Sequence, residues 1–288
     1  MIKIFICHFS LVHYMGIDYK YGKSENMSKE KQYSAKKISF LRRAVIASAS
    51  ITKQKNTIHS MTEVDITIPR NLIKEYEKNT GLRISFTGYI TSCFIKAISL
   101  FPEMNSFISG NKMVRLKNIT VSILVERNID NENVPEPMVI ENAEKLTCLD
   151  ITKKIRSAQG NTESKLGSLT GFSWFSSIPG FLLKSFVKMA DRNIKMGVKY
   201  GKLAITAAGM FSKEPLWFIP HGSATVLLTI GSIIHRVIET DGNYEKHEHL
   251  CLTASFDHDI IDGAPAARFM NELVKEIKSG DALKRILV

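Results

Sequence analysis

The chain has 288 residues and 44% of them are hydrophobic, which is enough to bury one large core or two smaller ones. The formal net charge of +11 is concentrated, because residues 1–43 carry nine basic and three acidic side chains and residues 161–203 carry seven and two. The rest is nearly neutral, which argues against the continuous basic face of a duplex nucleic-acid reader, and no apolar run reaches the about 18 residues of a membrane span.

Residues 1–37 are expected to be a flexible lead-in. The opening "MIKIFICHFSLVHYMG" faintly resembles a secretion signal but has no small-residue cleavage site, and Met15 or Met27 could equally be the start. Residues 20–37 are rich in Lys, Ser, Glu and Tyr, as flexible segments are. The four cysteines are scattered along the chain, which suits a reducing compartment and predicts a cytoplasmic location.

Strand-like and helix-like segments alternate in the first half of the chain. Residues 57–68 are rich in β-branched side chains and predict a strand, and Pro69 and Gly81 bracket a helix. Residues 86–101 are apolar nearly all round, as in a buried helix that stops at Pro102. Residues 119–125 predict a buried strand and residues 146–159 an amphipathic helix.

The second half continues the alternation. Strands are predicted at 203–211, where "LAITAAGMF" runs into Gly209, at 223–238, and at 249–256, where apolar and polar residues alternate. A helix follows from Pro265 to Gly280. The whole pattern predicts one mixed α/β domain over residues 38–288.

The stretch "SFDHDIIDGAPAARF" places His258 and Asp262 on the linker between a predicted strand and a predicted helix. A histidine near its reference pKa of about 6.5 can take a proton from a thiol or alcohol at neutral pH, and a nearby carboxylate can hold its tautomer. Gly263 would let the backbone turn tightly behind them. On its own, however, His-x-x-x-Asp is more often an ordinary polar loop.

This stretch resembles the signature of the acyltransferase component of 2-oxoacid dehydrogenase complexes, which is also similar to chloramphenicol acetyltransferase. Further resemblances fall in the family's order over residues 38–280: "LRRAV" (41–45), "FPEMN" (101–105), "PMVIENAEKLTCLDI" (137–151) and "LAITAAGMF" (203–211). The resemblance implies a two-layer, chloramphenicol acetyltransferase-like fold with a mixed β-sheet, assembled as a homotrimer.

The resemblance also implies roles for single residues. His258 would be the general base that deprotonates the thiol of coenzyme A or of dihydrolipoamide, and Thr206 would donate to the oxyanion of the tetrahedral intermediate. Asp262 would fix the loop and imidazole by pairing with Arg42. Because the family's active sites lie at subunit interfaces, His258 and Thr206 would meet across one. Without the resemblance, Thr206 would be an ordinary strand threonine.

The chain departs from the family in three ways. Asp259 follows the histidine where the dehydrogenase components usually carry arginine. The sequence shows no lipoyl domain, swinging linker or subunit-binding domain, so we expect a free-standing relative with no covalently bound cofactor. Coenzyme A would be its substrate, and any lipoyl group would come from a separate carrier protein.

The third departure is a basic amphipathic helical insertion at 161–203. At 100° per residue, five cations of one predicted helix starting near Pro179 fall within about 80° of one another, opposite an apolar side. They are Lys184, Lys188, Arg192, Lys195 and Lys199. The structural interpretation is a surface helix that packs on the core and exposes its charged face to solvent. Two functional interpretations stay open. The helix could be a lid whose Lys184 and Lys188 meet the phosphates of coenzyme A, or residues 174–199, with Trp174 and Phe175, could make a peripheral membrane contact.

His247 and His249 alternate on a predicted strand with no cysteine nearby, so surface positions on a hairpin are favoured over a metal site.

The whole sequence predicts an acyltransferase that moves an acyl group between coenzyme A and a thiol, hydroxyl or amine acceptor. The alternative is a non-catalytic trimeric scaffold or membrane-docking relative of the same fold.

Overall fold

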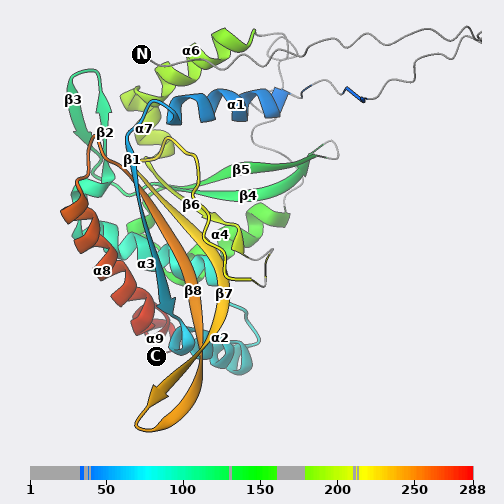
Figure 1. Cartoon of the computed structure of the whole chain (residues 1–288), viewed down its shortest axis with the longest axis vertical. Coiled ribbons are helices and arrows are strands. Elements are labelled where there is room, and N and C mark those ends of the chain that lie inside the picture. Colours follow the sequence, from blue (N-terminus) through cyan, green and yellow to red (C-terminus); the bar gives the residue numbers. More distant parts are fainter. Residues whose placement is uncertain are drawn as a thin grey trace, which may run out of the picture. The chain divides into compact units, whose positions relative to one another are not determined.

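The computed structural model describes residues 33–35, 38, 40–129, 132–160, 179–209, 212 and 214–287. Ile38–Val288 form one compact unit, to which the following description applies. Its described part holds a six-stranded sheet in the order β1-β8-β7-β6-β4-β5 (Figure 1). The strands are β1 (Thr57–Asp65), β4 (Val121–Ile129), β5 (Glu132–Ile140), β6 (Leu203–Ala207), β7 (Val226–Thr240) and β8 (Asn243–Asp257).

The sheet is mixed, which confirms the predicted fold class. Strand β6 runs parallel to both β4 and β7, whereas β1–β8, β7–β8 and β4–β5 pair antiparallel. A separate hairpin is formed by β2 (Ser106–Ser109) and β3 (Lys112–Arg115), which are joined by a turn through Gly110. A short 3₁₀ turn, Pro102–Asn105, leads into it.

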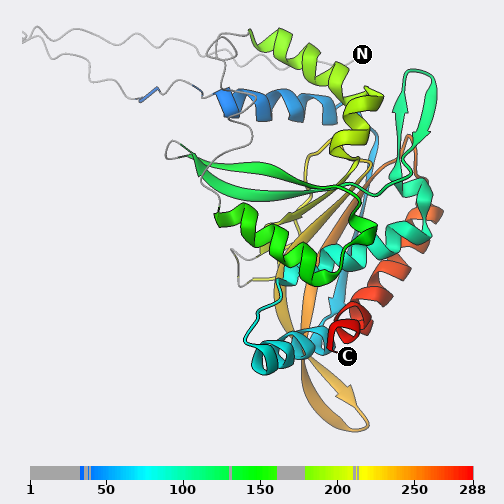
Figure 2. The same cartoon turned by 180° about the vertical axis from the view of Figure 1, so that it is seen from behind.

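Helices cover one face of the sheet (Figure 2). The α-helices of the described residues are α1 (Phe40–Thr52), α2 (Thr67–Thr80), α3 (Phe86–Leu100), α4 (Cys148–Gly160), α6 (Gly180–Asp191), α7 (Ile194–Tyr200), α8 (Gly263–Ser279) and α9 (Asp281–Leu287). The core between α3, α8 and the sheet is centred on Phe269, whose ring meets those of Phe94, Phe101 and Phe256 edge-on at 5.8–6.1 Å. Such aromatic pairs add about 0.5–1.5 kcal/mol each beyond the area they bury. They hold the end of β8 against α8.

The local sequence explains where several helices begin and end. Ser85 caps α3, accepting a hydrogen bond from the Gly88 amide, and the chain turns at Pro102 as predicted. Thr147 and Asp150 form a capping box at α4: the Asp150 carboxylate accepts from the Thr147 amide and hydroxyl, and the Thr147 hydroxyl accepts from the Asp150 amide. These bonds hold the pKa of Asp150 below its usual value.

The sequence prediction missed α1 and α9, and it was wrong about the single basic helix after Pro179. The chain forms two helices there, α6 and α7, because the Asn193 side chain accepts from the Met196 amide and starts a new helix. Lys195 and Lys199 therefore lie on a different helix from Lys184 and Lys188, and the continuous basic stripe is broken.

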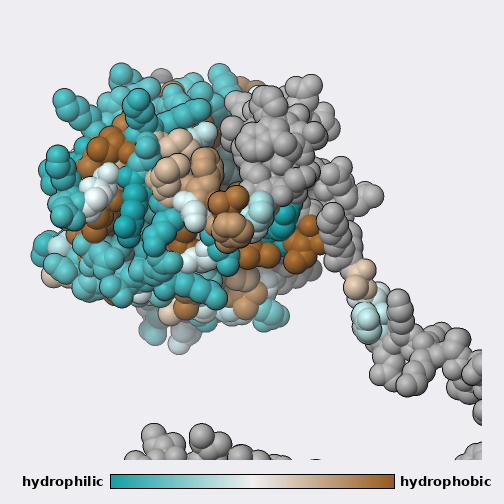
Figure 3. Space-filling model, turned by 90° about the horizontal axis from the view of Figure 1, so that it is seen from above, coloured by the Kyte–Doolittle hydropathy of each residue, from teal (hydrophilic) through white to brown (hydrophobic). Residues whose placement is uncertain are grey.

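Helix α6 packs against α1 through a narrow stripe that includes the buried Leu183, while four larger apolar side chains remain exposed. They are Phe181, Leu182, Phe186 and Met189. Figure 3 views the end of the unit that carries these helices and shows hydrophobic side chains among hydrophilic ones. Trp174 and Phe175 lie outside the described residues. Among the described residues, every helix is too short or too polar to cross a membrane.

Candidate active site

His258 lies on the linker between β8 and α8, as predicted. Strand β8 ends at Asp257, Ile261 anchors the linker in the core with 1% of its surface exposed, and α8 begins after its N-cap residue Asp262. The backbone of His258 is fixed because its amide donates to the Asn56 carbonyl oxygen at 2.6 Å. The side chain itself is 42% exposed, so it is available to a ligand.

The structure brings His258 and Asp262 together. Nδ1 of His258 lies 3.8 Å from Oδ1 of Asp262, which is an ion-pair distance but too long for a hydrogen bond. The Asp262 carboxylate thus faces Nδ1, and Nε2 is the ring nitrogen that it leaves open to a substrate. Catalytic contacts of this kind are often longer before substrate is bound.

A partly buried ion pair supports the linker from behind. Asp257, 5% exposed, accepts from Nζ of Lys55 at 2.8 Å, and Lys55 also donates to the Ser223 carbonyl at 2.7 Å. Asp257 accepts from the Asp259 amide as well, and the Asp259 carboxylate accepts from the Asn56 side chain at 2.8 Å. In this chain the residue after the histidine thus ties the linker to the segment before β1.

A cavity of about 220 Å³ opens near the start of β1 and the end of β8, and its lining includes Ser255 but neither His258 nor Asp262. Its walls come from the end of α1, the start of β1, the end of β8 and residues 220–224. Its polar lining includes Lys53, Lys55, His59, His221 and Ser255. His59 Nδ1 lies 2.8 Å from the Ser255 hydroxyl, and partial burial together with the nearby His221 lowers the pKa of His59. The lining has two lysines and no acidic side chain, but Lys55 is already paired with Asp257 and the lowered pKa favours a neutral His59, so Lys53 is the main cation offered to an anionic ligand.

Thr206 lies far from His258 within one chain. Thr206 pairs with Thr229 on β7, and Thr229 pairs with Thr253 on β8, so the three side chains form a row on one face of the sheet. His258 follows Thr253 by five positions, which is about 17 Å along the strand, in addition to two strand spacings of about 4.8 Å. The two predicted catalytic groups therefore cannot contact one substrate atom in a single chain.

The row of threonines carries unsatisfied hydroxyls. Thr229 and Thr253 are each 1% exposed, and among the described residues neither side-chain oxygen has a hydrogen-bond partner. Thr206 is only half-buried at the open end of the row. Close backbone packing fixes its strand: Gly209 lies against Gly231 of β7, where a Cβ on Gly209 would be 1.6 Å from the Gly231 carbonyl oxygen.

The remaining predicted site residues are spread more widely. Gly263 is the first residue of α8, but it has no left-handed φ and a Cβ there would meet nothing within 4 Å, so the tight turn expected of it is not seen. Arg42 lies in the first turn of α1, about 15 Å along that helix from Thr52. Among the described residues the ion-pair partner of Asp262 is His258. Lys184 and Lys188 are exposed on α6.

Sequence reasoning missed Lys55, His59 and His221. Nothing in their local pattern marks them. The pairing of β1 with β8, in which Thr57 lies opposite Asp257 and His59 opposite Ser255, brings Lys55 and His59 to their partners, and His221 comes from the segment before β7. A larger cavity of about 510 Å³ is lined by residues that include Arg115, Lys117 and Lys199, and neither cavity is lined by His258, Asp262 or Thr206.

The comparisons with known proteins agree on one family. Residues 29–170 and 193–284 match the model of the 2-oxoacid dehydrogenases acyltransferase (catalytic domain), and the unmatched residues 171–192 fall inside the predicted insertion. A relative in Bacillus subtilis, the lipoamide acyltransferase component of branched-chain alpha-keto acid dehydrogenase complex, is 27% identical over 227 residues. Those residues are 77% of this chain but 46% of the relative, so the chain spans about half of that protein's length.

Solved structures share the fold at low identity. A probable dihydrolipoamide acetyltransferase from Listeria monocytogenes superposes with a TM-score of 0.66 and 19% identity, covering 87% of this chain and 96% of that one. The dihydrolipoamide acetyltransferase of Azotobacter vinelandii gives 0.63 and 16%, covering 92% and 99%. With most of its length matched by the family model, and with the fold of these enzymes, the chain belongs to the family of 2-oxoacid dehydrogenase acyltransferase catalytic domains.

Proposed function

We propose that the chain is an acyltransferase of the dihydrolipoamide acyltransferase type, which moves an acyl group between coenzyme A and the thiol of a lipoyl group, with His258 as general base. The observation that carries the proposal is the placement of His258 and Asp262, 3.8 Å apart, on the linker between β8 and α8. Hydroxyl or amine acceptors would use the same base.

The reaction would proceed in two proton-balanced steps. Nε2 of His258 takes the proton from the attacking thiol, and the thiolate adds to the carbonyl carbon of the thioester. Asp262 stabilises the imidazolium, and the hydroxyl of Thr206 donates to the oxyanion of the tetrahedral intermediate. The intermediate then expels the other thiolate, which takes back the proton from His258. Loss of one such oxyanion donor typically raises the barrier by about 2.7–4 kcal/mol.

The spacing of the three residues supports these roles. In the Azotobacter vinelandii enzyme, a serine, a histidine 52 positions later and an asparagine four positions after that have been investigated for their role in catalysis. Thr206, His258 and Asp262 have the same two spacings in this chain. Threonine keeps the hydroxyl of serine, and aspartate keeps an oxygen that can face the imidazole, with a charge in addition.

A shared site would require at least two copies of the chain. Since Thr206 and His258 are about 17 Å apart along the sheet of one protomer, we propose that Thr206 of one subunit completes the site around His258 of another, in a homotrimer. Within this proposal, Arg42 and Asp262 would form an ion pair only if they came from different subunits or if the chain rearranged to bring them together.

The phosphates of coenzyme A need cations. Lys53 and His221 border the cavity near the end of β8, and Lys184 and Lys188 are exposed on α6. Because the reacting thiol must reach His258, we place the phosphates near Lys53 first. Lys53→Ala would then raise the KM for coenzyme A with little change in kcat, and Lys188→Ala would do the same if α6 acts as a lid.

The proposal also covers the protein that carries the acyl group and the cellular compartment of this chain. The Bacillus subtilis relative is a lipoamide acyltransferase component of a complex, so we propose that a lipoyl-bearing protein supplies or accepts the acyl group. A cytoplasmic location fits the described cysteines, Cys93, Cys148 and Cys251, which are free thiols buried in the protein.

The second candidate is a scaffold or membrane-docking role. It is favoured by one observation, the exposed Phe181, Leu182, Phe186 and Met189 on α6 beside lysines. Co-sedimentation with anionic lipid vesicles tests it. Binding that Phe181→Ser with Phe186→Ser abolishes would support this role, and absence of binding would remove it.

The decisive experiment measures thiol release from acyl-coenzyme A donors of increasing chain length, with and without dihydrolipoamide. His258→Ala is compared with wild type. A fall of at least about a hundredfold supports His258 as the base. Equal inertness of both proteins with every donor and acceptor would overturn acyl transfer and favour the scaffold.

A further inference from the structure

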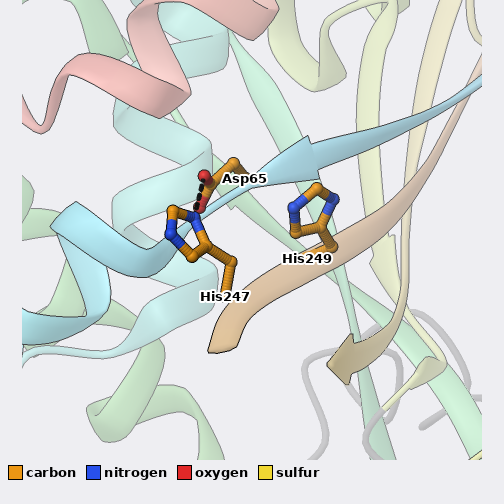
Figure 4. A group of neighbouring side chains, drawn as sticks. All are labelled: Asp65, His247 and His249. Carbon is orange, nitrogen blue, oxygen red and sulfur yellow. Dashed lines mark hydrogen bonds and ion pairs between the residues drawn. The ribbon is translucent and has the colours of Figure 1, made fainter. Parts of the chain in front are cut away.

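Three side chains with metal-binding chemistry lie together at the other end of the β1–β8 pair. Asp65 is the last residue of β1, and its partner in the antiparallel register is His249 of β8. His247 is two positions earlier on β8, so it lies on the same face as His249. Figure 4 shows the carboxylate and the two imidazoles on that face. One potential ligand atom from each lies within 4.8 Å of the others.

His249 is the unexplained member of this cluster. Its side chain is 15% exposed, and both ring nitrogens are shielded from solvent without a hydrogen-bond partner. The nearest acidic oxygen, Oε2 of Glu63, is 3.8 Å from Nδ1, which exceeds hydrogen-bond range. Leaving a buried polar group without a hydrogen-bond partner is destabilising, and a bound ion would remove this penalty at His249.

Asp65 and His247 are already oriented as paired ligands. Oδ2 of Asp65 lies 2.7 Å from Nδ1 of His247, and Oδ1 accepts from the Thr67 amide at 2.9 Å. The Thr67 amide thus fixes the carboxylate from outside the cluster, as groups around metal ligands do. His247 Nε2 is 3.4 Å from Glu245. An ion would replace the proton now shared by Asp65 and His247.

Two imidazoles and one carboxylate are a donor set that zinc uses. Zinc bonds of about 2.0–2.2 Å in tetrahedral geometry place ligand atoms about 3.3 Å apart, so side-chain shifts of an ångström or so would close the cluster. Glu63 lies nearby but is held by Arg236 at 2.6 and 2.9 Å, which leaves the fourth position to water. We propose that Asp65, His247 and His249 bind one divalent transition-metal ion, with zinc the best match.

The site is separate from the proposed chemistry. His249 and His258 are nine positions apart on and just beyond β8, about 30 Å along an extended strand. The ion would join the end of β1 to β8 and, through Thr67, to the first residue of α2. Its role is therefore structural: it would stabilise the native state without taking part in acyl transfer.

The test is isothermal titration of tag-free, EDTA-treated full-length protein with ZnCl2, together with thermal unfolding. We expect about one ion per chain, micromolar or tighter, and a higher Tm with zinc. His249→Gln and Asp65→Asn should each weaken binding at least tenfold, whereas His235→Gln, an exposed histidine on the neighbouring β7, should not.

Two further results guard against misfolded variants. Cobalt titration of the wild type should give the visible absorption of a tetrahedral site, and zinc-edge absorption spectroscopy should count two histidine nitrogens. Binding only in the millimolar range, or equal binding by wild type, His249→Gln and Asp65→Asn, would overturn the site. Acyl transfer that needs His258 would remain intact in either case.

Discussion

At the residue scale, the position of His258 depends on Asn56 and Lys55. The His258 amide is held by Asn56, and Asp257 beside it is held by Lys55. Both partners lie in the short segment between α1 and β1. The partly buried Lys55–Asp257 pair thus couples the linker that carries His258 to the start of the sheet.

Lys55→Met should destabilise the protein by about 3 kcal/mol, because it leaves the buried carboxylate of Asp257 without its cation. Denaturant unfolding would measure this loss. Lys53→Met is the matched control: it changes an exposed lysine two positions away and should stay within about 0.5 kcal/mol. Equal stability of the two variants would show that the pair does not support the linker.

At the element scale, two local features define how strands and helices are placed. The capping box of Thr147 and Asp150 starts α4, and the contact of Gly209 with Gly231 sets how the chain leaves β6. The capping box can be recognised from the spacing of Thr147 and Asp150 in the sequence. The contact of Gly209 with Gly231 can be recognised only once the register of the sheet is known. Both can be tested by substitutions at exposed or tightly packed positions.

Asp150→Ala should lower Tm at pH 7, since α4 loses its cap. Hydrogen bonds from Thr147 lower the pKa of Asp150 in the folded state below 3.8. The stabilisation is therefore present above that pH and is lost as the pH falls through the lowered pKa. The difference in Tm between wild type and variant should shrink as the pH drops below about 4, and a constant difference down to pH 3 would contradict this account.

Gly209→Ala should be much more destabilising than Gly180→Ala. A Cβ on Gly209 would lie 1.6 Å from a backbone oxygen, so the backbone of β6 or β7 must move, whereas a Cβ on Gly180 would meet nothing within 4 Å. We expect a loss of about 3 kcal/mol for Gly209→Ala and a near-neutral effect for Gly180→Ala, measured by chemical unfolding. Similar effects would mean that the close approach is not required.

At the scale of the whole molecule, the mixed sheet and the strand–helix linker could be predicted, because alternation along 249–256 and the helical spacing after Pro265 are strong periodic signals. The division into α6 and α7 could not, because it depends on the Asn193 cap within one continuous amphipathic pattern. Lys55, His59 and Asp65 escaped notice because only the β1–β8 register brings them to their partners.

Mixing two inactive variants tests the shared site directly. If Thr206 and His258 act from different subunits, trimers refolded from equal amounts of Thr206→Ala and His258→Ala chains should have about a quarter of their sites intact. We expect each variant alone to be nearly inactive and the mixture to regain activity after refolding. Failure of the refolded mixture to regain activity, with trimers confirmed by ultracentrifugation, would place both groups in one chain.

The separation of Thr206 and His258, about 17 Å along the strand and two strand spacings across the sheet, has one consequence in dilute solution if the site is shared between subunits. A single chain can be fully folded and still hold only half of each of two sites. Activity per chain would then follow the association equilibrium and would fall on dilution below the dissociation constant of the assembly, while each chain kept its secondary structure. Individual chains of this protein would then become catalytically active only when they associate.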